Sequence, residues 1–162
     1  MNKGLFITVE GIEGTGKSTN IDFMADFIKS HGQRVLIVRE PGGTKTAEEI
    51  RRILLTHRDE EIPEISELLL FFASRALLLN NLIIPSLNKG TWILCDRFTD
   101  ATRAYQGAGR SLGQDKVNTL ADWVQKGLEP DLTILLDASA EVGMSRVANR
   151  GSADRMDSQN LE

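Results

Sequence analysis

The sequence predicts an α/β fold of three layers, in which a central parallel β-sheet is covered by helices on both faces. Two observations predict this fold. Short runs of apolar and β-branched residues alternate with helical patterns, at residues 5–10, 34–38, 91–96 and 131–137. These runs are apolar throughout, which is typical of strands that are buried on both faces of a sheet.

Helical patterns fill the gaps between these strands. An apolar stripe at helical spacing follows the first strand and ends at Gly32, a usual helix-stop residue. Three more helices are expected, an amphipathic one at 46–55, a long and mostly buried one at 64–87, and one at 113–128.

The chain as a whole, residues 1–162, suits a single domain without repeats or linkers. Its net charge of −4 argues against broad nucleic-acid binding, which needs a basic surface. No apolar run looks long enough to span a bilayer, and the N-terminal residues show no signal-peptide pattern. The single cysteine, Cys95, excludes an internal disulfide and suits the reducing cytosol. We therefore expect a cytoplasmic protein with no membrane or nucleic-acid partner.

The last residues differ from the rest of the chain. After a helical start at 140–147, residues 149–162 are polar and form no closing strand or helix. We therefore expect that the C-terminal part of the natural protein is missing from this sequence.

Residues 11–18 read GIEGTGKS, which matches the phosphate-loop pattern G-x-x-x-x-G-K-[ST] between a strand and a helix. Its glycines let backbone amides turn inward onto phosphate oxygens, and the helix N-terminus adds its positive dipole end. In this pattern Lys17 reaches the β- and γ-phosphates, and Ser18 offers its hydroxyl to Mg²⁺. The loop predicts a three-layer P-loop NTPase fold. The residues expected to bind ATP are Gly11, Ile12, Glu13, Gly14, Thr15, Gly16, Lys17, Ser18 and Thr19.

Two aspartates end the third and fourth predicted strands, at the sheet edge where such folds bind ligands. Asp96 is well placed as the second acid of the metal site, acting through metal-bound water, although strand-end aspartates also serve in turns. We expect Ser18 and Asp96 to serve Mg²⁺.

The phosphate loop alone leaves the reaction open. A GTPase switch would need N-K-x-D and D-x-x-G, and the nearest segments, 88–91 and 137–140, lack the deciding letters. A small-molecule kinase fits better, because arginine forks suit a phosphate acceptor. The candidate arginines are Arg39, Arg51, Arg75, Arg97, Arg103, Arg150 and Arg155, of which we expect about half to be merely solvated.

Five segments occur in one order along the chain: EGIEGTGKST, REPGGT, FFASR, DRFTDATRAYQG and PDLTILLD. Together they resemble the bacterial thymidylate kinases, which phosphorylate dTMP to dTDP with ATP and Mg²⁺. The resemblance runs from residue 4 to the last residue. It also implies a homodimer formed through helices near the sheet, for which the apolar segment 65–87 offers a face.

The resemblance assigns residues to the thymine base and sugar. Phe71 would stack on thymine and Arg75 would hydrogen-bond it, and a spacing of four places both on one helical face. Without the resemblance, Phe71 reads as a core residue. Thr102 and Gln106 match polar readers of the thymine edge. Tyr105 matches a tyrosine that crowds the sugar 2′ position and so favours deoxyribose.

The resemblance also assigns residues to the phosphate group of the acceptor. Arg97 matches the arginine that grips this phosphate, and with Lys17 it would be catalytic. Arg51 matches a second basic contact, and Glu40 a carboxylate near the phosphate and Mg²⁺. Arg39 would either serve phosphate or brace the adjacent glycine turn.

Glu13 is unexpected within a phosphate loop, because its carboxylate should be repelled by polyphosphate. Loop filler, metal ligand and substrate contact are all open readings from the loop alone. The resemblance implies the third, in which Glu13 accepts a hydrogen bond from the 3′-hydroxyl of the acceptor sugar.

A mobile lid is implied near residues 147–157. In this family the catalytic arginine lies either in the phosphate loop or in a lid over ATP, and this loop has Gly14 and Thr15 where an arginine would sit. Arg150 and Arg155 are then the catalytic candidates, although a polar loop with arginines is often only solvated.

The expected function is therefore phosphorylation of dTMP with ATP and Mg²⁺. The alternative is another nucleoside monophosphate kinase acting on UMP or CMP, against which Phe71, Arg75 and Tyr105 count only through the resemblance.

Overall fold

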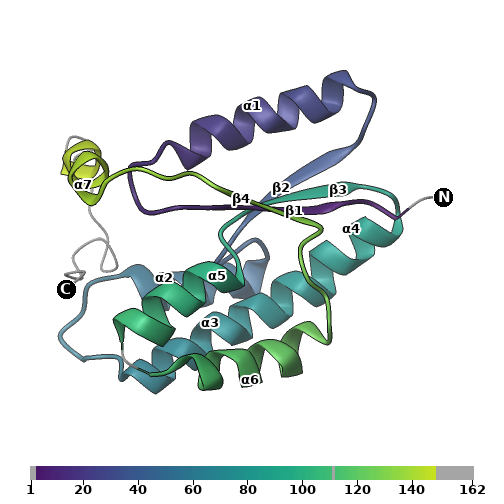
Figure 1. The fold of residues 1–162 in the computed structure, drawn as a ribbon. Coiled ribbons are helices and arrows are strands. Elements are labelled where there is room, and N and C mark those ends of the chain that lie inside the picture. The colour runs from purple at the N-terminus through teal and green to yellow at the C-terminus, as the bar shows by residue number, and fades with distance from the viewer. Residues whose placement is uncertain (1–2, 111, 149–162) are drawn as a thin grey trace.

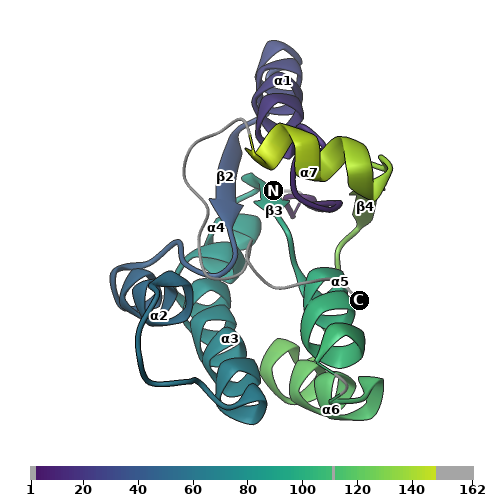
Figure 2. The same cartoon turned by 90° about the vertical axis from the view of Figure 1, so that its left-hand side faces the viewer.

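The computed structural model describes residues 3–110 and 112–148. A parallel sheet of order β2-β3-β1-β4 lies at the centre (Figure 1). Its strands are β1 (Phe6–Glu10), β2 (Val35–Arg39), β3 (Trp92–Asp96) and β4 (Leu132–Leu135). Helix α1 (Lys17–Ser30) covers one face, and most other helices cover the opposite face (Figures 1 and 2). The predicted three-layer α/β fold with a parallel sheet is confirmed.

The helices on the opposite face form two arms below the sheet (Figure 2). They are α2 (Lys45–Leu55), α3 (Glu64–Leu78), α4 (Ile84–Asn88), α5 (Thr99–Thr102) and α6 (Gln114–Gln125), with π-helical segments η1 (Leu79–Ile83) and η2 (Arg103–Gly109). The last described helix, α7 (Ala140–Ala148), lies beyond the carboxyl edge of the sheet. The helix formed by α5 and η2 was missed by the sequence patterns, because its glycines and polar residues break apolar periodicity.

Segments α3, η1 and α4 form one helical run, Glu64–Asn88. The π-helical turn η1 directly precedes the turn that contains Pro85, which has no amide hydrogen to donate to an i−4 carbonyl. By length and composition this run could cross a membrane, so the expectation that no apolar run is long enough was wrong. Its apolar character has another source here, because Leu78, Leu79 and Leu87 are buried against the sheet.

The alternating side chains of the strands build a core on each face of the sheet. On the face towards α3 and α4, Phe6 of β1 packs with Ile93 and Cys95 of β3. On the other face, Ile7 and Val9 pack with Leu94 and with α1. This alternation explains why both strands read as continuous apolar runs. A third cluster joins α3 to α6.

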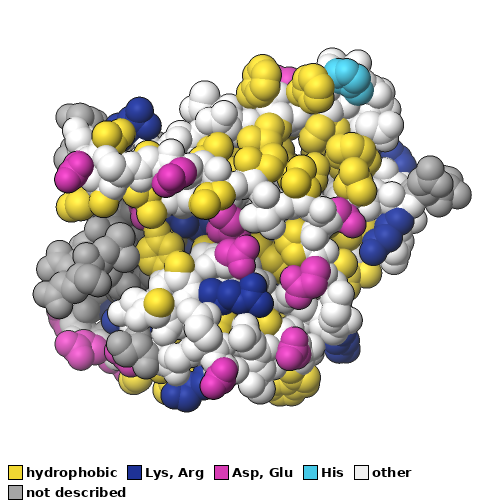
Figure 3. Space-filling model, in the orientation of Figure 1, with side chains coloured by type: hydrophobic (Ala, Val, Ile, Leu, Met, Phe, Trp, Pro, Cys, Tyr) yellow, Lys and Arg dark blue, Asp and Glu magenta, His cyan; other side chains and the backbone are white. Residues whose placement is uncertain are grey.

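One face of helix α1 is buried in the core, and the opposite face carries exposed apolar side chains. Ile21 is 3% exposed in the core, whereas Phe23 is 70% exposed and Phe27 is 57% exposed. Figure 3 shows hydrophobic side chains gathered on the surface over α1 and the sheet edge below it.

We expect Ile21→Ala to lower the free energy of unfolding by about 2–5 kcal/mol, because it leaves a cavity in a closed core. Phe23→Ala removes more atoms, yet it should cost less than about 1 kcal/mol, because the ring is already in water. Urea unfolding of the two variants and the parent chain measures both values. A Phe23→Ala cost equal to that of Ile21→Ala would contradict this description of α1.

Candidate functional site

The phosphate loop turns tightly between β1 and α1. Gly16 has a φ of 85° directly before α1, and Gly14 has a φ of 77°. A Cβ on Gly14 would lie 2.2 Å from the carbonyl oxygen of Gly143 in α7. Glycine is therefore needed at this position both for its left-handed backbone and for the close approach of α7.

The side chain of Lys17, the first residue of α1, reaches back across the phosphate loop. Its ammonium donates to the carbonyl oxygens of Gly11, at 2.9 Å, and Ile12, at 2.7 Å. Burial, followed by the charge of Arg97, lowers the pKa of Lys17 to about 8. A partly desolvated cation at the mouth of the loop is a strong partner for a phosphate oxygen.

Helix α7 adds a basic residue that the sequence analysis missed. Arg146 donates from Nη1 to the carbonyl oxygen of Gly14, 3.0 Å away. Its only sequence signal was its place between the fourth strand and the arginine-containing segment after residue 148.

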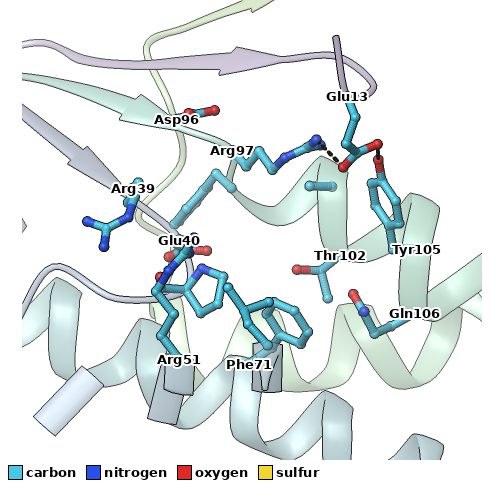
Figure 4. Close-up of a pocket in the computed structure, with 14 residues that line it drawn as sticks. Glu13, Arg39, Glu40, Arg51, Phe71, Asp96, Arg97, Thr102, Tyr105 and Gln106 are labelled. Carbon is cyan, nitrogen blue, oxygen red and sulfur yellow. Dashed lines mark hydrogen bonds and ion pairs between the residues drawn. The ribbon is translucent and has the colours of Figure 1, made fainter. Parts of the chain in front are cut away.

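A pocket opens beside the loop, between the carboxyl edge of the sheet, α2, α3 and the α5–η2 helix (Figure 4). Of the residues expected to bind dTMP, it is lined by Glu13, Glu40, Arg51, Phe71, Arg97, Thr102, Tyr105 and Gln106. Phe71 faces this pocket, whereas its neighbour Phe72 is the core residue, 2% exposed. Helical spacing alone could not separate these two rings.

Arg75 differs from the expectation, because it lies behind the pocket wall and not in its lining. It is 1% exposed, and its guanidinium donates to both carboxylate oxygens of Glu40 at 2.6–3.1 Å. It also donates to the hydroxyls of Thr99 and Thr102. In this arrangement Arg75 ties β2 and α5 to α3, and it orients two lining residues.

Glu13 points away from the phosphate cradle and into the pocket. Its Oε1 accepts from Arg97 Nη2 at 2.6 Å, and its Oε2 accepts from the Tyr105 hydroxyl at 2.7 Å (Figure 4). The guanidinium of Arg97 also lies 5.2 Å from the centre of the Tyr105 ring. Burial is the main cause that raises the pKa of Tyr105 to about 12, so this phenol remains a donor.

The backbone of Arg97 adopts a left-handed conformation, with a φ of 66°. Its amide donates to Val9, and the next amide, of Phe98, donates to the carboxylate of Glu10 at 2.7 Å. Non-glycine residues in this conformation store strain, and such residues concentrate at functional sites. Glu10, a buried acid at the end of an apolar strand, was not selected from the sequence.

Arg39 braces the glycine turn that follows β2. It donates to Glu48 Oε2 at 2.9 Å, and Glu48 Oε1 accepts the amide of Gly43 at 2.7 Å. Arg51 holds the same segment by donating to the carbonyl of Pro41 at 2.9 Å. Of the two roles open for Arg39, bracing the turn is the one that these contacts support.

Asp96 lies between two hollows. It lines the pocket with Arg97, and it lines a groove on the other side with Ser18 of the phosphate loop. Its Oδ1 is buried and has no hydrogen-bond partner among residues 3–110 and 112–148. An unpaired carboxylate oxygen beside a hydroxyl fits oxygen ligation of Mg²⁺, directly or through water.

Comparison with known proteins identifies the family. A family model described as thymidylate kinase matches residues 9–162. The chain belongs to the thymidylate kinase family. It is 50% identical to a thymidylate kinase of Hahella chejuensis over all of this chain and 78% of that relative. Identity to a thymidylate kinase of Pseudomonas putida is 52%, over 96% of this chain and 74% of the relative.

A solved structure agrees with this assignment. The thymidylate kinase of Ehrlichia chaffeensis superposes with a TM-score of 0.78 and 36% identity, over 91% of this chain and 79% of that one. The predicted resemblance is thus confirmed, and the chain is a nucleoside monophosphate kinase. Membership of the thymidylate kinase family rules against the GTPase reading and implies ATP as co-substrate, typically with Mg²⁺.

The predicted lid falls largely outside the described residues. Residues 147 and 148 end α7, whereas Arg150 and Arg155 lie beyond the part of the chain that the structure describes. Their assignment as catalytic residues of this thymidylate kinase family member stays a prediction.

Glu10 should give the chain a distinctive pH dependence of stability. Burial is the main cause that raises the pKa of Glu10 to about 7, from 4.5. Between these values the folded chain keeps a proton that the unfolded chain has lost, so the free energy of unfolding falls as pH rises. Relative to that of Glu10→Gln, the free energy of unfolding of the parent should fall by roughly 3 kcal/mol between pH 4.5 and 7.5.

Urea unfolding of both proteins across this range measures the difference. Glu40, whose pKa is also raised by burial, is present in both proteins, so its own titration contributes to both profiles. Lys17 titrates at higher pH, since its pKa is lowered to about 8 from 10.5. Parallel pH profiles for parent and variant would show that Glu10 is ionised in the folded state.

Proposed function

We propose that this chain transfers the γ-phosphoryl group of ATP to the 5′-phosphate of dTMP, giving ADP and dTDP. One observation carries the proposal. Asp96, at the end of β3, lines both the groove beside Ser18 of the phosphate loop and the pocket, and Arg97, which follows it, lines the pocket together with Glu13 of the loop. A donor and an acceptor held on these two sides would meet at the edge of the sheet, as in-line transfer requires.

The donor side is the phosphate loop, residues 11–19. Its amides and the N-terminus of α1 would hold the ATP phosphates, with Lys17 on the β- and γ-phosphates. Arg146, already in contact with the loop, adds positive charge at its outer side.

The acceptor phosphate would lie at the sheet end of the pocket, near Arg97 and Arg51. Both side chains can meet phosphate oxygens in bidentate fashion. A phosphate oxygen of dTMP is already ionised at neutral pH, so the transfer needs positioning and charge neutralisation but no strong general base. Tyr105, whose pKa is raised to about 12, is in any case unsuited to take a proton.

Mg²⁺, held by Ser18 and through water by Asp96, would neutralise charge on the phosphate oxygens of ATP. The unpaired, buried Oδ1 of Asp96 supports this assignment.

The base and sugar would occupy the far end of the pocket. Phe71 offers a ring for stacking, and Thr102 and Gln106 present polar atoms beside it (Figure 4). Glu13 and Tyr105, bonded to each other, stand over the sugar position, where they would bind the 3′-hydroxyl and crowd a 2′-hydroxyl.

Three further parts of the proposal concern the assembled protein. The exposed Ile65 and Leu69 of α3 support a homodimer formed along this helix. A lid near 147–157 would carry Arg150 or Arg155 to the transferring phosphoryl group. The protein would act in the cytoplasm.

A coupled assay of ADP formation against a panel of nucleoside monophosphates tests the substrate. We expect kcat/KM for dTMP to exceed that for dCMP and UMP by at least about 100-fold, because the site reads both the base edge and the sugar. Equal use of UMP or CMP would overturn the substrate assignment and leave the kinase activity standing.

Glu13→Ala tests whether this phosphate-loop residue serves the acceptor dTMP and not ATP. We expect KM for dTMP to rise by about 10- to 100-fold, because one charged hydrogen bond to the acceptor is lost, with less than about threefold change in the Kd for ATP. Steady-state kinetics gives the first quantity, and calorimetric titration with a non-hydrolysable ATP analogue gives the second. A collapse of ATP affinity with an unchanged KM for dTMP would show that Glu13 serves the donor side.

A further inference from the structure

A buried acid lies directly behind the base end of the pocket. Glu67 of α3 is 0% exposed, and each of its carboxylate oxygens has its own partner. Oε1 accepts from Gln106 Nε2 at 3.0 Å, and Oε2 accepts from Arg110 Nη2 at 3.0 Å. Such a fully desolvated carboxylate is costly unless it is paired, and here Arg110 supplies the compensating charge.

This contact decides which way the amide of Gln106 points. A carboxylate only accepts hydrogen bonds, so only the NH₂ end of the amide can face Glu67. The reversed amide would place Oε1 against a carboxylate oxygen, two acceptors in contact inside the protein. Gln106 is itself 2% exposed, so water does little to screen that repulsion.

The carbonyl end of the Gln106 amide consequently faces the pocket. Gln106 is part of the pocket lining, with Thr102 and Phe71 beside it (Figure 4). Among the described residues, no donor is bonded to its Oε1, and this oxygen is not one of the buried atoms without a partner. The pocket therefore presents a fixed acceptor to whatever base lies there.

We propose that Glu67 is a positioning residue that sets base specificity by locking Gln106 as a hydrogen-bond acceptor. A pyrimidine that carries N3–H, such as thymine or uracil, donates to this oxygen. Cytosine presents an acceptor at N3, which would face Gln106 Oε1 unpaired. The proposal rests on the proposed function, and it adds the reason why one class of pyrimidine is selected.

The test compares two acceptors that share the 5-methyl group, dTMP and 5-methyl-dCMP. In Glu67→Gln, the carboxylate becomes an amide, whose oxygen can accept from the Gln106 NH₂ or whose NH₂ can donate to Gln106 Oε1, so either orientation of Gln106 is satisfied and the lock is lost. The ratio of kcat/KM for dTMP to that for 5-methyl-dCMP should fall by about tenfold or more, mainly through KM. Loss of packing alone would lower both values together and leave the ratio unchanged, which would overturn the proposal.

Two matched variants serve as controls. Glu64→Gln removes the charge of an exposed acid on the same helix, and it should leave the ratio unchanged and lower stability only slightly, because the lost charge lies in the first turn of the helix. Arg110→Lys weakens the contact with Glu67 Oε2 but keeps a positive charge beside this carboxylate, so it should lower stability while keeping the ratio, because Glu67 stays an acceptor for Gln106. A ratio that falls equally in Arg110→Lys would also overturn the proposal.

A measurement on the parent protein keeps the proposal testable if Glu67→Gln does not fold. In spectra of the ¹⁵N-labelled protein, the side-chain NH₂ of Gln106 should exchange slowly with solvent, both before and after dTMP is added. Fast exchange would overturn the proposal. If the parent does not prefer dTMP, the proposed function fails. If the parent prefers dTMP but the Gln106 NH₂ exchanges fast, only the proposed role of Glu67 fails.

Discussion

The parallel pairing of β1 with β3 is the constraint on which the site depends. The two strands run in register, with Val9 opposite Asp96, so both end at the same edge of the sheet. The phosphate loop therefore begins beside the place where Asp96 and Arg97 leave β3. The amide of Arg97 extends the pairing by donating to Val9, and the Glu10 carboxylate takes the next amide. A shift of one residue in this register would turn the side chains of β3 to opposite faces and separate the metal and phosphate groups from the loop.

Buried carboxylates orient the walls of the pocket in three places. Glu10 holds the turn that carries Arg97, Glu40 binds the guanidinium of Arg75, and Glu67 binds Gln106. Each acid is 8% exposed or less, so each is expensive to desolvate and is compensated by hydrogen bonds of fixed direction. Such contacts contribute little net stability, but they fix the orientation of their partners, because a misdirected polar group in the interior finds no water to replace the lost hydrogen bond.

The fold was predictable from the sequence because it depends on local patterns. Four apolar runs and a complete phosphate-loop motif determine strand direction and edge, and the structure bears them out. The residues behind the pocket were not predictable in this way. Glu67 stands in an apolar helical run, and nothing local tells that its carboxylate meets Gln106, 39 positions away. The position of Arg75 behind the pocket was not predictable for the same reason, since its spacing from Phe71 gives the helix face but not the Glu40 carboxylate and the hydroxyls that hold it there.

The pairing of Glu13 with Arg97 resolves the apparent conflict of an acid within a phosphate loop. The loop backbone turns its amides towards one side, while the carboxylate of Glu13 reaches the other side and binds Arg97. A guanidinium has five N–H donors in a rigid fork, and the bond to Glu13 uses one of them. Arg97 can thus keep this contact, which fixes its direction, and still offer a two-pronged face to a phosphate. Glu13 then repels an anion only on the sugar side of the pocket. Its charge therefore helps to aim the arginine and does not oppose the phosphates that the loop amides hold.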